Sequence, residues 1–124
     1  MEYSIKKDEK YIIVGLKVEK LDAVVSPDLK SDFVKYNQES YRNIILDLSE
    51  TKYIDSSGLS AILVANRLCK NEKGTFVLTN VSDHVNKLIT ISQLHNVLEI
   101  RNSNQEAIDL IFMNELENDI NNSK

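Results

Sequence analysis

The chain has little cysteine, proline or glycine and no tryptophan: its 124 residues include 1 Cys, 1 Pro and 3 Gly. So little glycine and proline excludes collagen-like and low-complexity chains. The single cysteine, Cys69, cannot form a disulfide within the chain, and its apolar helical surroundings predict a buried thiol. One cysteine and two separated histidines, His84 and His95, also predict no structural zinc site.

An excess of positive charge and long apolar runs are missing as well. The net charge is −4, from 15 basic and 19 acidic residues, so the chain lacks the basic face of nucleic-acid binders and of proteins bound to anionic membranes. Residues 1–7 lack the apolar core of a signal peptide, and no apolar run approaches the roughly 18 residues of a membrane span. We therefore expect a cytoplasmic protein with no nucleic-acid partner and no membrane insertion.

Length and apolar content favour one folded domain. The chain is near the common domain size of roughly 100–150 residues, and 42% of its residues are hydrophobic. Residues 118–124 are polar, so we expect a single domain over residues 1–117 followed by a frayed tail.

Apolar runs and helix-capping residues alternate along the chain. Residues 3–7 and 11–18 predict a β-hairpin, and further strands are expected over 42–48, 75–79 and 97–100. Helices are expected between these strands and at the end, beginning near Ser26, Ser57, Ser82 and Ser103. Alternation at this spacing predicts an α/β fold, with a mixed, mostly parallel sheet of about five strands and about four helices.

The most specific segment joins the strand ending near Leu48 to the helix that follows. Asp55, Ser56 and Ser57 stand at the start of this helix, where unpaired backbone N–H groups and the helix dipole meet. Gly58 lacks a side chain and lets another segment approach closely. Taken alone, the pattern fits either a capping cluster or a binding site.

In this context, Asp55-Ser56-Ser57-Gly58-Leu59 resembles the signature of STAS domains, and more narrowly of bacterial anti-sigma factor antagonists. The resemblance extends over about residues 3–115, with further matches at Leu21-Asp22, at Val81-Ser82 and at Leu88. It implies the STAS fold and a protein that is not an enzyme and uses no cofactor. It also implies an anti-sigma factor serine kinase as the partner.

The same resemblance implies a switch at Ser57, the serine just before the glycine. The unphosphorylated protein would bind the kinase and free a sigma factor, and phosphorylation of Ser57 would end binding. A serine phosphatase acting on Ser57 would restore it. A phosphate adds about −1.5 to −2 charges. Beside Asp55 and Asp22 it would make the local surface strongly negative.

We expect the partner to contact the loop before the helix and the helix itself. The residues predicted to bind it are Asp22, Asp55, Ser56, Ser57, Gly58, Leu59, Ser60, Leu63 and Arg67. Within this set, Leu59 and Leu63 fall among polar positions on a helical projection. They form either an exposed ridge for the partner or a surface that a neighbouring helix covers, and the sequence leaves both alternatives open.

Two other functions are compatible with the residues around Ser57. A STAS subunit of a stressosome-like or transport-associated complex is the alternative within the family. A small hydrolase using Ser57 would need a base and an oxyanion hole beside it, and the sequence does not place His84 or His95 there. We expect a monomer or a weak dimer.

Overall fold

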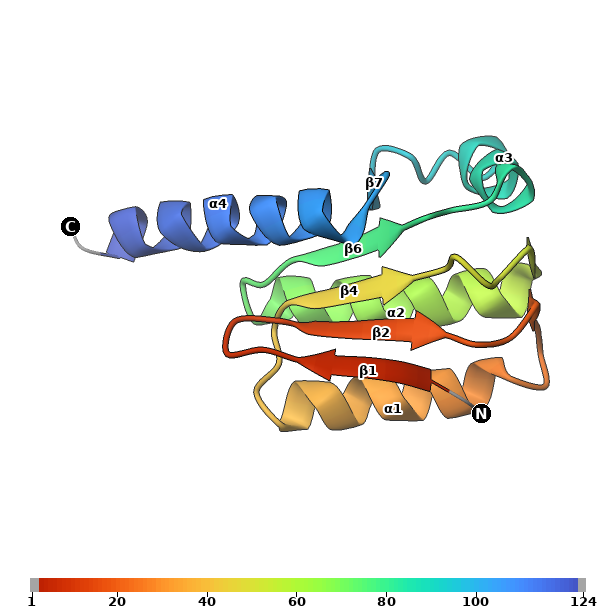
Figure 1. Ribbon diagram of the computed structural model, residues 1–124, viewed down its shortest axis with the longest axis horizontal. Coiled ribbons are helices and arrows are strands. Elements are labelled where there is room, and N and C mark those ends of the chain that lie inside the picture. The colour runs from red at the N-terminus through yellow and green to blue at the C-terminus, as the bar shows by residue number, and fades with distance from the viewer. Residues whose placement is uncertain (1–2, 123–124) are drawn as a thin grey trace.

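Five strands form one mixed sheet in the order β1-β2-β4-β6-β7 in the computed structural model, which describes residues 3–122 (Figure 1). β1 and β2 form an antiparallel hairpin, and β2, β4, β6 and β7 run parallel. The strands are β1 (Tyr3–Lys7), β2 (Ile12–Leu16), β4 (Ile44–Asp47), β6 (Phe76–Thr79) and β7 (Glu99–Arg101). The predicted hairpin and mostly parallel sheet are therefore confirmed.

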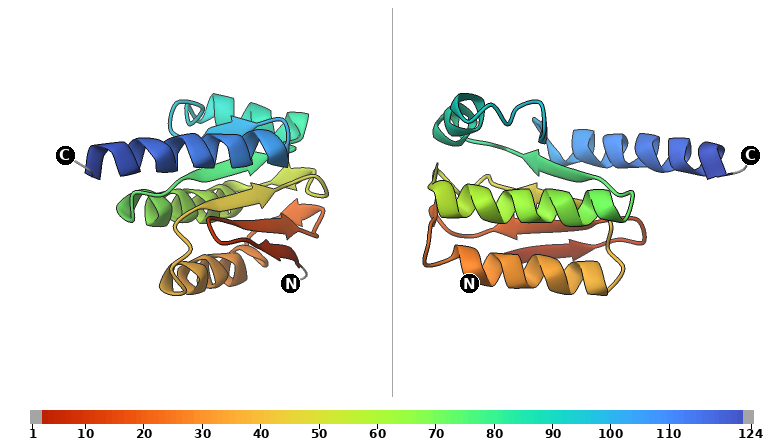
Figure 2. Two further views of the ribbon diagram at one scale, coloured as in Figure 1. Left: turned by 60° about the vertical axis from the view of Figure 1, so that its left-hand side comes forward. Right: turned by 180° about the vertical axis from the view of Figure 1, so that it is seen from behind.

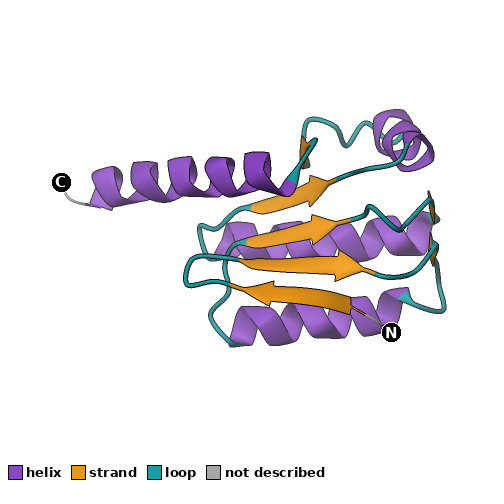
Figure 3. Ribbon diagram, viewed as in Figure 1, coloured by secondary structure: helices purple, strands orange, loops and turns teal. Residues whose placement is uncertain are grey.

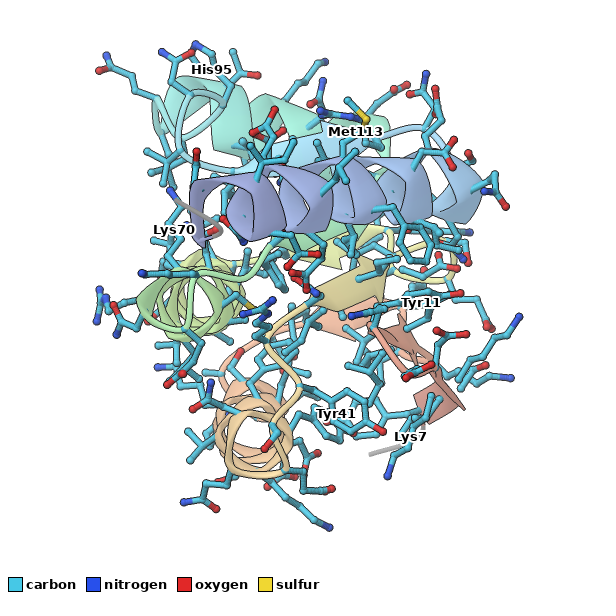
Figure 4. All side chains as sticks on the ribbon, turned by 90° about the vertical axis from the view of Figure 1, so that its left-hand side faces the viewer. Lys7, Tyr11, Tyr41, Lys70, His95 and Met113 are labelled. Atoms are coloured by element: carbon cyan, nitrogen blue, oxygen red, sulfur yellow. The ribbon has the colours of Figure 1, made fainter. Side chains whose placement is uncertain are left out.

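Within residues 3–122 the sheet is accompanied by four helices, as the sequence predicts: α1 (Ser26–Gln38), α2 (Ser56–Asn71), α3 (Asp83–Ile91) and α4 (Asn104–Asn122). α1 and α2 lie side by side on one face, and α4 packs on the opposite face (Figure 2). Figure 3 shows helices α1 and α2 lying behind the strands of the sheet.

The two faces of the sheet carry separate apolar cores. In β4, Ile44 and Leu46 join the larger cluster under α1 and α2, whereas Ile45 joins a smaller cluster under α4. Successive side chains of a strand point to opposite faces. A strand covered on both sides therefore needs a continuous apolar run, which is why this segment shows no alternation.

A second, two-stranded sheet was not expected from the sequence. β3 (Lys20–Leu21) pairs in parallel with β5 (Tyr53–Ile54), in segments that the sequence predicts to be loops. Strands of two residues are too short to leave a periodic apolar pattern. This small sheet matters for function, because it holds the loop after β2 against the segment that leads into α2.

The predicted start of α1 differs in its cap. The sequence predicts Ser26 as the N-cap, but Val25 occupies that position and makes no side-chain cap. Ser26 is the first helical residue, and its hydroxyl donates a hydrogen bond to the Asp22 carbonyl at 2.6 Å. The Asp22 carboxylate accepts hydrogen bonds from the Val24 and Val25 N–H groups instead.

The C-terminal helix is longer than predicted. α4 continues to Asn122, through residues 118–122 that the sequence assigns to a frayed tail. The Asn118 amide donates a hydrogen bond to the Lys73 carbonyl at 3.0 Å, so a polar side chain helps to anchor this turn. The rest of the predicted tail, Ser123 and Lys124, lies outside the described residues. None of the helices in residues 3–122 has the length and apolar character needed to span a membrane.

Candidate functional site

The segment singled out by the sequence lies at the carboxyl ends of the parallel strands. The chain leaves β4 at this edge, and α1 and α2 both begin there (Figure 1). Each crossover from one parallel strand to the next must start at the same edge, so the loops that begin the helices gather there. Residues far apart in sequence, such as Asp22 and Asp55, are brought to one end of the molecule in this way and line a common groove.

Asp55 is the N-cap residue of α2, as expected for a capping cluster at this helix start. Its backbone is extended, and its carboxylate accepts a hydrogen bond from the Gly58 N–H at 2.9 Å. Its carbonyl accepts from the Leu59 N–H at 3.0 Å. The cap fixes the first turn of the helix, and with it the positions of Ser56 and Ser57.

Gly58 is buried where α2 meets the small β3-β5 sheet. A methyl group at this position would lie 2.6 Å from Ile54 Cγ1 and 2.8 Å from Leu21 Cγ. Only a residue without a side chain fits so close to both strands, and the close approach expected at Gly58 is confirmed. The start of α2 is therefore fixed against the loop that carries Asp22.

One groove at the start of α2 is rich in serine. Its volume is about 350 Å³. We call it the serine groove, and the residues that line it are Ala23, Ser26, Pro27, Lys30, Ser56, Ser57 and Ser60. Ser56 is exposed, whereas Ser57 and Ser60 are half-buried. The first turn of α2 thus faces the first turn of α1 across a space lined by small hydroxyl side chains.

A second groove adjoins Asp55 and has the opposite character. Its volume is about 600 Å³. We call it the acidic groove, and it is lined by Glu19, Lys20, Leu21, Asp22, Tyr53, Ile54, Asp55 and His84. The rings of Tyr53 and His84 pack edge to face, with centroids 5.2 Å apart. Three carboxylates and an aromatic pair make this groove suited to a basic or apolar side chain of a partner.

The structure decides between the two alternatives for the leucines of α2. Leu59 is buried, with 8% of its surface exposed, and belongs to the larger core. Leu63 is half-buried and packs against the same core, whereas Arg67 is exposed. The exposed ridge of two leucines is therefore wrong. Both residues lie at the margin of the buried face of α2. At such positions a helical projection does not distinguish a buried side chain from an exposed one.

The predicted site residues omit the side of the serine groove that α1 and the loop before it supply. Ser26 and Lys30 come from α1, some thirty positions before the motif, so no spacing within the motif points to them. The order of strands and helices could have pointed to them, because parallel strands place the starts of the helices that follow them at one edge of the sheet. The predicted set of site residues divides accordingly: Asp22 and Asp55 line the acidic groove, and Ser56, Ser57 and Ser60 line the serine groove.

Asp47, at the end of β4, has a structural role at the same edge. Burial alone would raise the pKa of its carboxyl, but hydrogen bonds from Ser49, Asn80 and Asn104 hold that pKa below its usual range. Asn104 is the first residue of α4. The carboxylate thus joins the end of β4 to the start of α4 and keeps the edge of the sheet in place.

Comparison with known proteins agrees with this geometry. The family model of the STAS domain matches residues 3–107. The anti-sigma-B factor antagonist of Listeria monocytogenes is 29% identical over 82 residues, which cover 66% of this chain and 72% of the relative.

Two solved structures share the fold. An anti-sigma-factor antagonist (STAS) domain protein from Planctomyces limnophilus is 16% identical, with a TM-score of 0.79 over 88% of this chain and 97% of that one. The Bacillus cell fate determinant SpoIIAA in its phosphorylated form is 20% identical, with a TM-score of 0.69 over 89% of this chain and 99% of that one. Since the family model covers most of the sequence, the chain belongs to the STAS domain family.

Proposed function

We propose that this protein is an anti-sigma factor antagonist, a regulatory binding module that acts in the cytoplasm. In its unphosphorylated form it binds an anti-sigma factor kinase through the start of α2 and so frees a sigma factor. The observation that carries this proposal is the position of Ser57 in the first turn of α2, half-buried in the serine groove. Relatives named as anti-sigma factor antagonists support the role.

The surface around Ser57 suits close contact with a partner. Exposed or half-buried residues at the start of α2 and in the loop after β3 form the contact surface: Asp22, Asp55, Ser56, Ser57, Ser60, Leu63 and Arg67. Gly58 and Leu59 are buried, and they act by fixing the helix from beneath. Small side chains near Ser57 let the backbone of a partner approach, and the acidic groove beside them selects basic groups.

Phosphorylation of Ser57 ends binding by adding charge rather than by changing the fold. The phosphate carries about −1.5 to −2 charges at neutral pH. In a contact that excludes water, the added charge must lose its hydration, which costs on the order of several kcal/mol. A serine phosphatase reverses the modification and returns the protein to its binding form.

The test combines affinity capture with phosphate mapping. The protein is used to capture partners in the presence of ADP and then of ATP, and the expected partner is a kinase of the anti-sigma type that is released with ATP. Mass spectrometry should then find one phosphate on Ser57. The Ser57→Ala variant should keep binding in ATP, and Ser57→Asp should bind more weakly than the unmodified protein.

Ser56→Ala is the matched control, because Ser56 is the exposed neighbour in the same turn. It should leave the phosphorylation of Ser57 unchanged. A phosphate on Ser56 in place of Ser57 would contradict the assignment. Capture of a large STAS assembly or a transporter, with no kinase, would contradict the antagonist function itself.

A further inference from the structure

We propose that the serine groove is the receptor for a phosphate on Ser57, with Lys30 as its counter-ion. This inference rests on the proposed function only in taking Ser57 as the phosphorylated residue. It adds where the phosphate goes once it is attached. It also assigns a role to a side chain of α1 that lies outside the sequence motif.

The composition of the groove is unusual for this chain. The net charge of the protein is −4, yet the seven residues that line the groove include one lysine, four serines and no carboxylate. The volume of about 350 Å³ is sufficient for a phosphate, which is only slightly larger than a few water molecules. The groove therefore offers positive charge and hydroxyl donors where a dianion would be attached.

Lys30 is available to pair with this dianion. It is half-buried in the groove, and the ion pairs found among residues 3–122 do not include it. The nearest acids on α1 are Asp28 and Asp32, each two positions from Lys30, and residues two apart on a helix do not face each other. Asp32 instead accepts a hydrogen bond from the Tyr3 hydroxyl at 2.6 Å.

The hydroxyl groups of the groove are available as well. In the described part of the chain, the Ser57 side chain makes no hydrogen bond, and neither do those of Ser56 and Ser60. Ser26 is different, because its hydroxyl already donates to the Asp22 carbonyl. Phosphate oxygens accept hydrogen bonds strongly. Lys30, Ser56 and Ser60 therefore supply donors that the unphosphorylated protein leaves unused.

The charges of the acidic groove also favour a phosphate that lies in the serine groove. The acidic groove presents Glu19, Asp22 and Asp55, with Lys20 as its cation. A phosphate on Ser57 is repelled from these carboxylates and attracted to the ammonium of Lys30. The phosphorylated surface then differs from the unphosphorylated one by a filled serine groove, and a partner that inserts there is excluded without any movement of α2.

The experiment places phosphoserine directly at position 57 by genetic encoding, so that no kinase is needed. Phosphorus NMR then follows the second ionisation of the phosphate, which occurs near pH 6 in a free phosphoserine. In Lys30→Met, which removes the charge and keeps the chain length, the pKa of the phosphate should rise by about 0.2–0.7, the equivalent of one ion pair at a protein surface. Raising the salt concentration should shrink this difference.

Two variants complete the design. Lys35→Met removes a charge from an exposed position of the same helix and should leave the phosphate pKa unchanged. Lys30→Arg keeps the charge and should restore the lower value, which also shows that the groove still folds. Equal phosphate pKa values with and without Lys30 would overturn the receptor. A larger change of the phosphate pKa in Asp55→Asn than in Lys30→Met would also overturn it, because the phosphate would then face the acidic groove. Neither result depends on whether a kinase recognises Ser57.

Discussion

The Cα atom of Gly58 lies against the backbone carbonyl of Leu21, so that the first turn of α2 and strand β3 are in direct contact. The same carbonyl accepts a hydrogen bond from the Asp55 N–H at 3.2 Å. These contacts hold the two segments that line the acidic groove in a fixed relation. The glycine of the motif is therefore a packing residue, on which the geometry of the site depends.

Replacing this glycine should disturb the fold and the site together. Gly58→Ala places a methyl group against the Leu21 backbone, which cannot move without breaking the β3-β5 pair. We expect a loss of about 1–3 kcal/mol in the free energy of unfolding, as for other overpacked sites. Urea denaturation measures it. Gly15→Ala is the control: its methyl group would meet only Ser4 of the edge strand β1, at 3.2 Å from Cβ and 3.4 Å from the backbone oxygen. Equal stability of the two variants would contradict the packing role.

Truncation of the α2 leucines should affect stability according to burial. Leu59→Ala leaves a cavity in the larger core, and we expect it to lower the free energy of unfolding by about 2–5 kcal/mol. Leu63→Ala should cost less, because Leu63 is half-buried. Arg67→Ala is the control at an exposed position, with a change within about 0.5 kcal/mol. Thermal or urea melts that show Leu59→Ala as stable as Arg67→Ala would place Leu59 on the surface after all.

A buried carboxylate holds α4 to the opposite edge of the sheet. Glu115 is 8% exposed; it pairs with Arg42 and accepts a hydrogen bond from the Asn43 amide at 2.6 Å. Burial alone would raise the pKa of Glu115, but the bonds from Arg42 and Asn43 hold it below its usual range. The carboxylate therefore stabilises the fold above the unfolded pKa of about 4.3, and this contribution is lost as the pH falls through the lower folded pKa.

Glu115→Gln should accordingly destabilise the protein at neutral pH and less so in acid. We expect a loss of about 1.5–3 kcal/mol at pH 7, the range for hydrogen bonds to a charged group. Unfolding curves measured from pH 7 downward should bring the stabilities of the variant and the unmodified protein together as the pH falls through the folded pKa of Glu115, which lies below its usual range. Glu117→Gln, at an exposed position of the same helix, is the control. A stability difference for Glu115→Gln that stays constant with pH would show that charge is not its cause.

The single cysteine should be unreactive until the protein unfolds. Cys69 is fully buried in the larger core, and burial raises the pKa of its thiol to about 12. The thiolate is the reactive form, so a disulfide reagent at pH 8 should label the folded protein slowly and the urea-unfolded protein fast. A variant with Cys69→Ser and Asn71→Cys moves the thiol to an exposed position and should react at once. Rapid labelling of native Cys69 would contradict its burial.

The order of the elements and the place of the motif follow from local patterns in the sequence. A continuous apolar run indicates strand β4. The capping residues Asp55 and Ser82 mark the starts of α2 and α3, where their side chains accept the expected backbone hydrogen bonds. These signals are local, because a strand covered on both faces and a helix start each depend on a few neighbouring residues. The chain could therefore be read as an α/β fold with Ser57 at a helix start.

The surroundings of that helix start depend on how distant segments pack together. The β3-β5 pair is too short to leave a pattern, and the burial of Leu59 depends on segments that pack beside it, not on its own helix. Lys30 and Ser57 share a groove because parallel strands bring the starts of α1 and α2 to one edge. Side-chain contacts between distant segments arise from the packing of whole elements, and a local sequence pattern does not contain them.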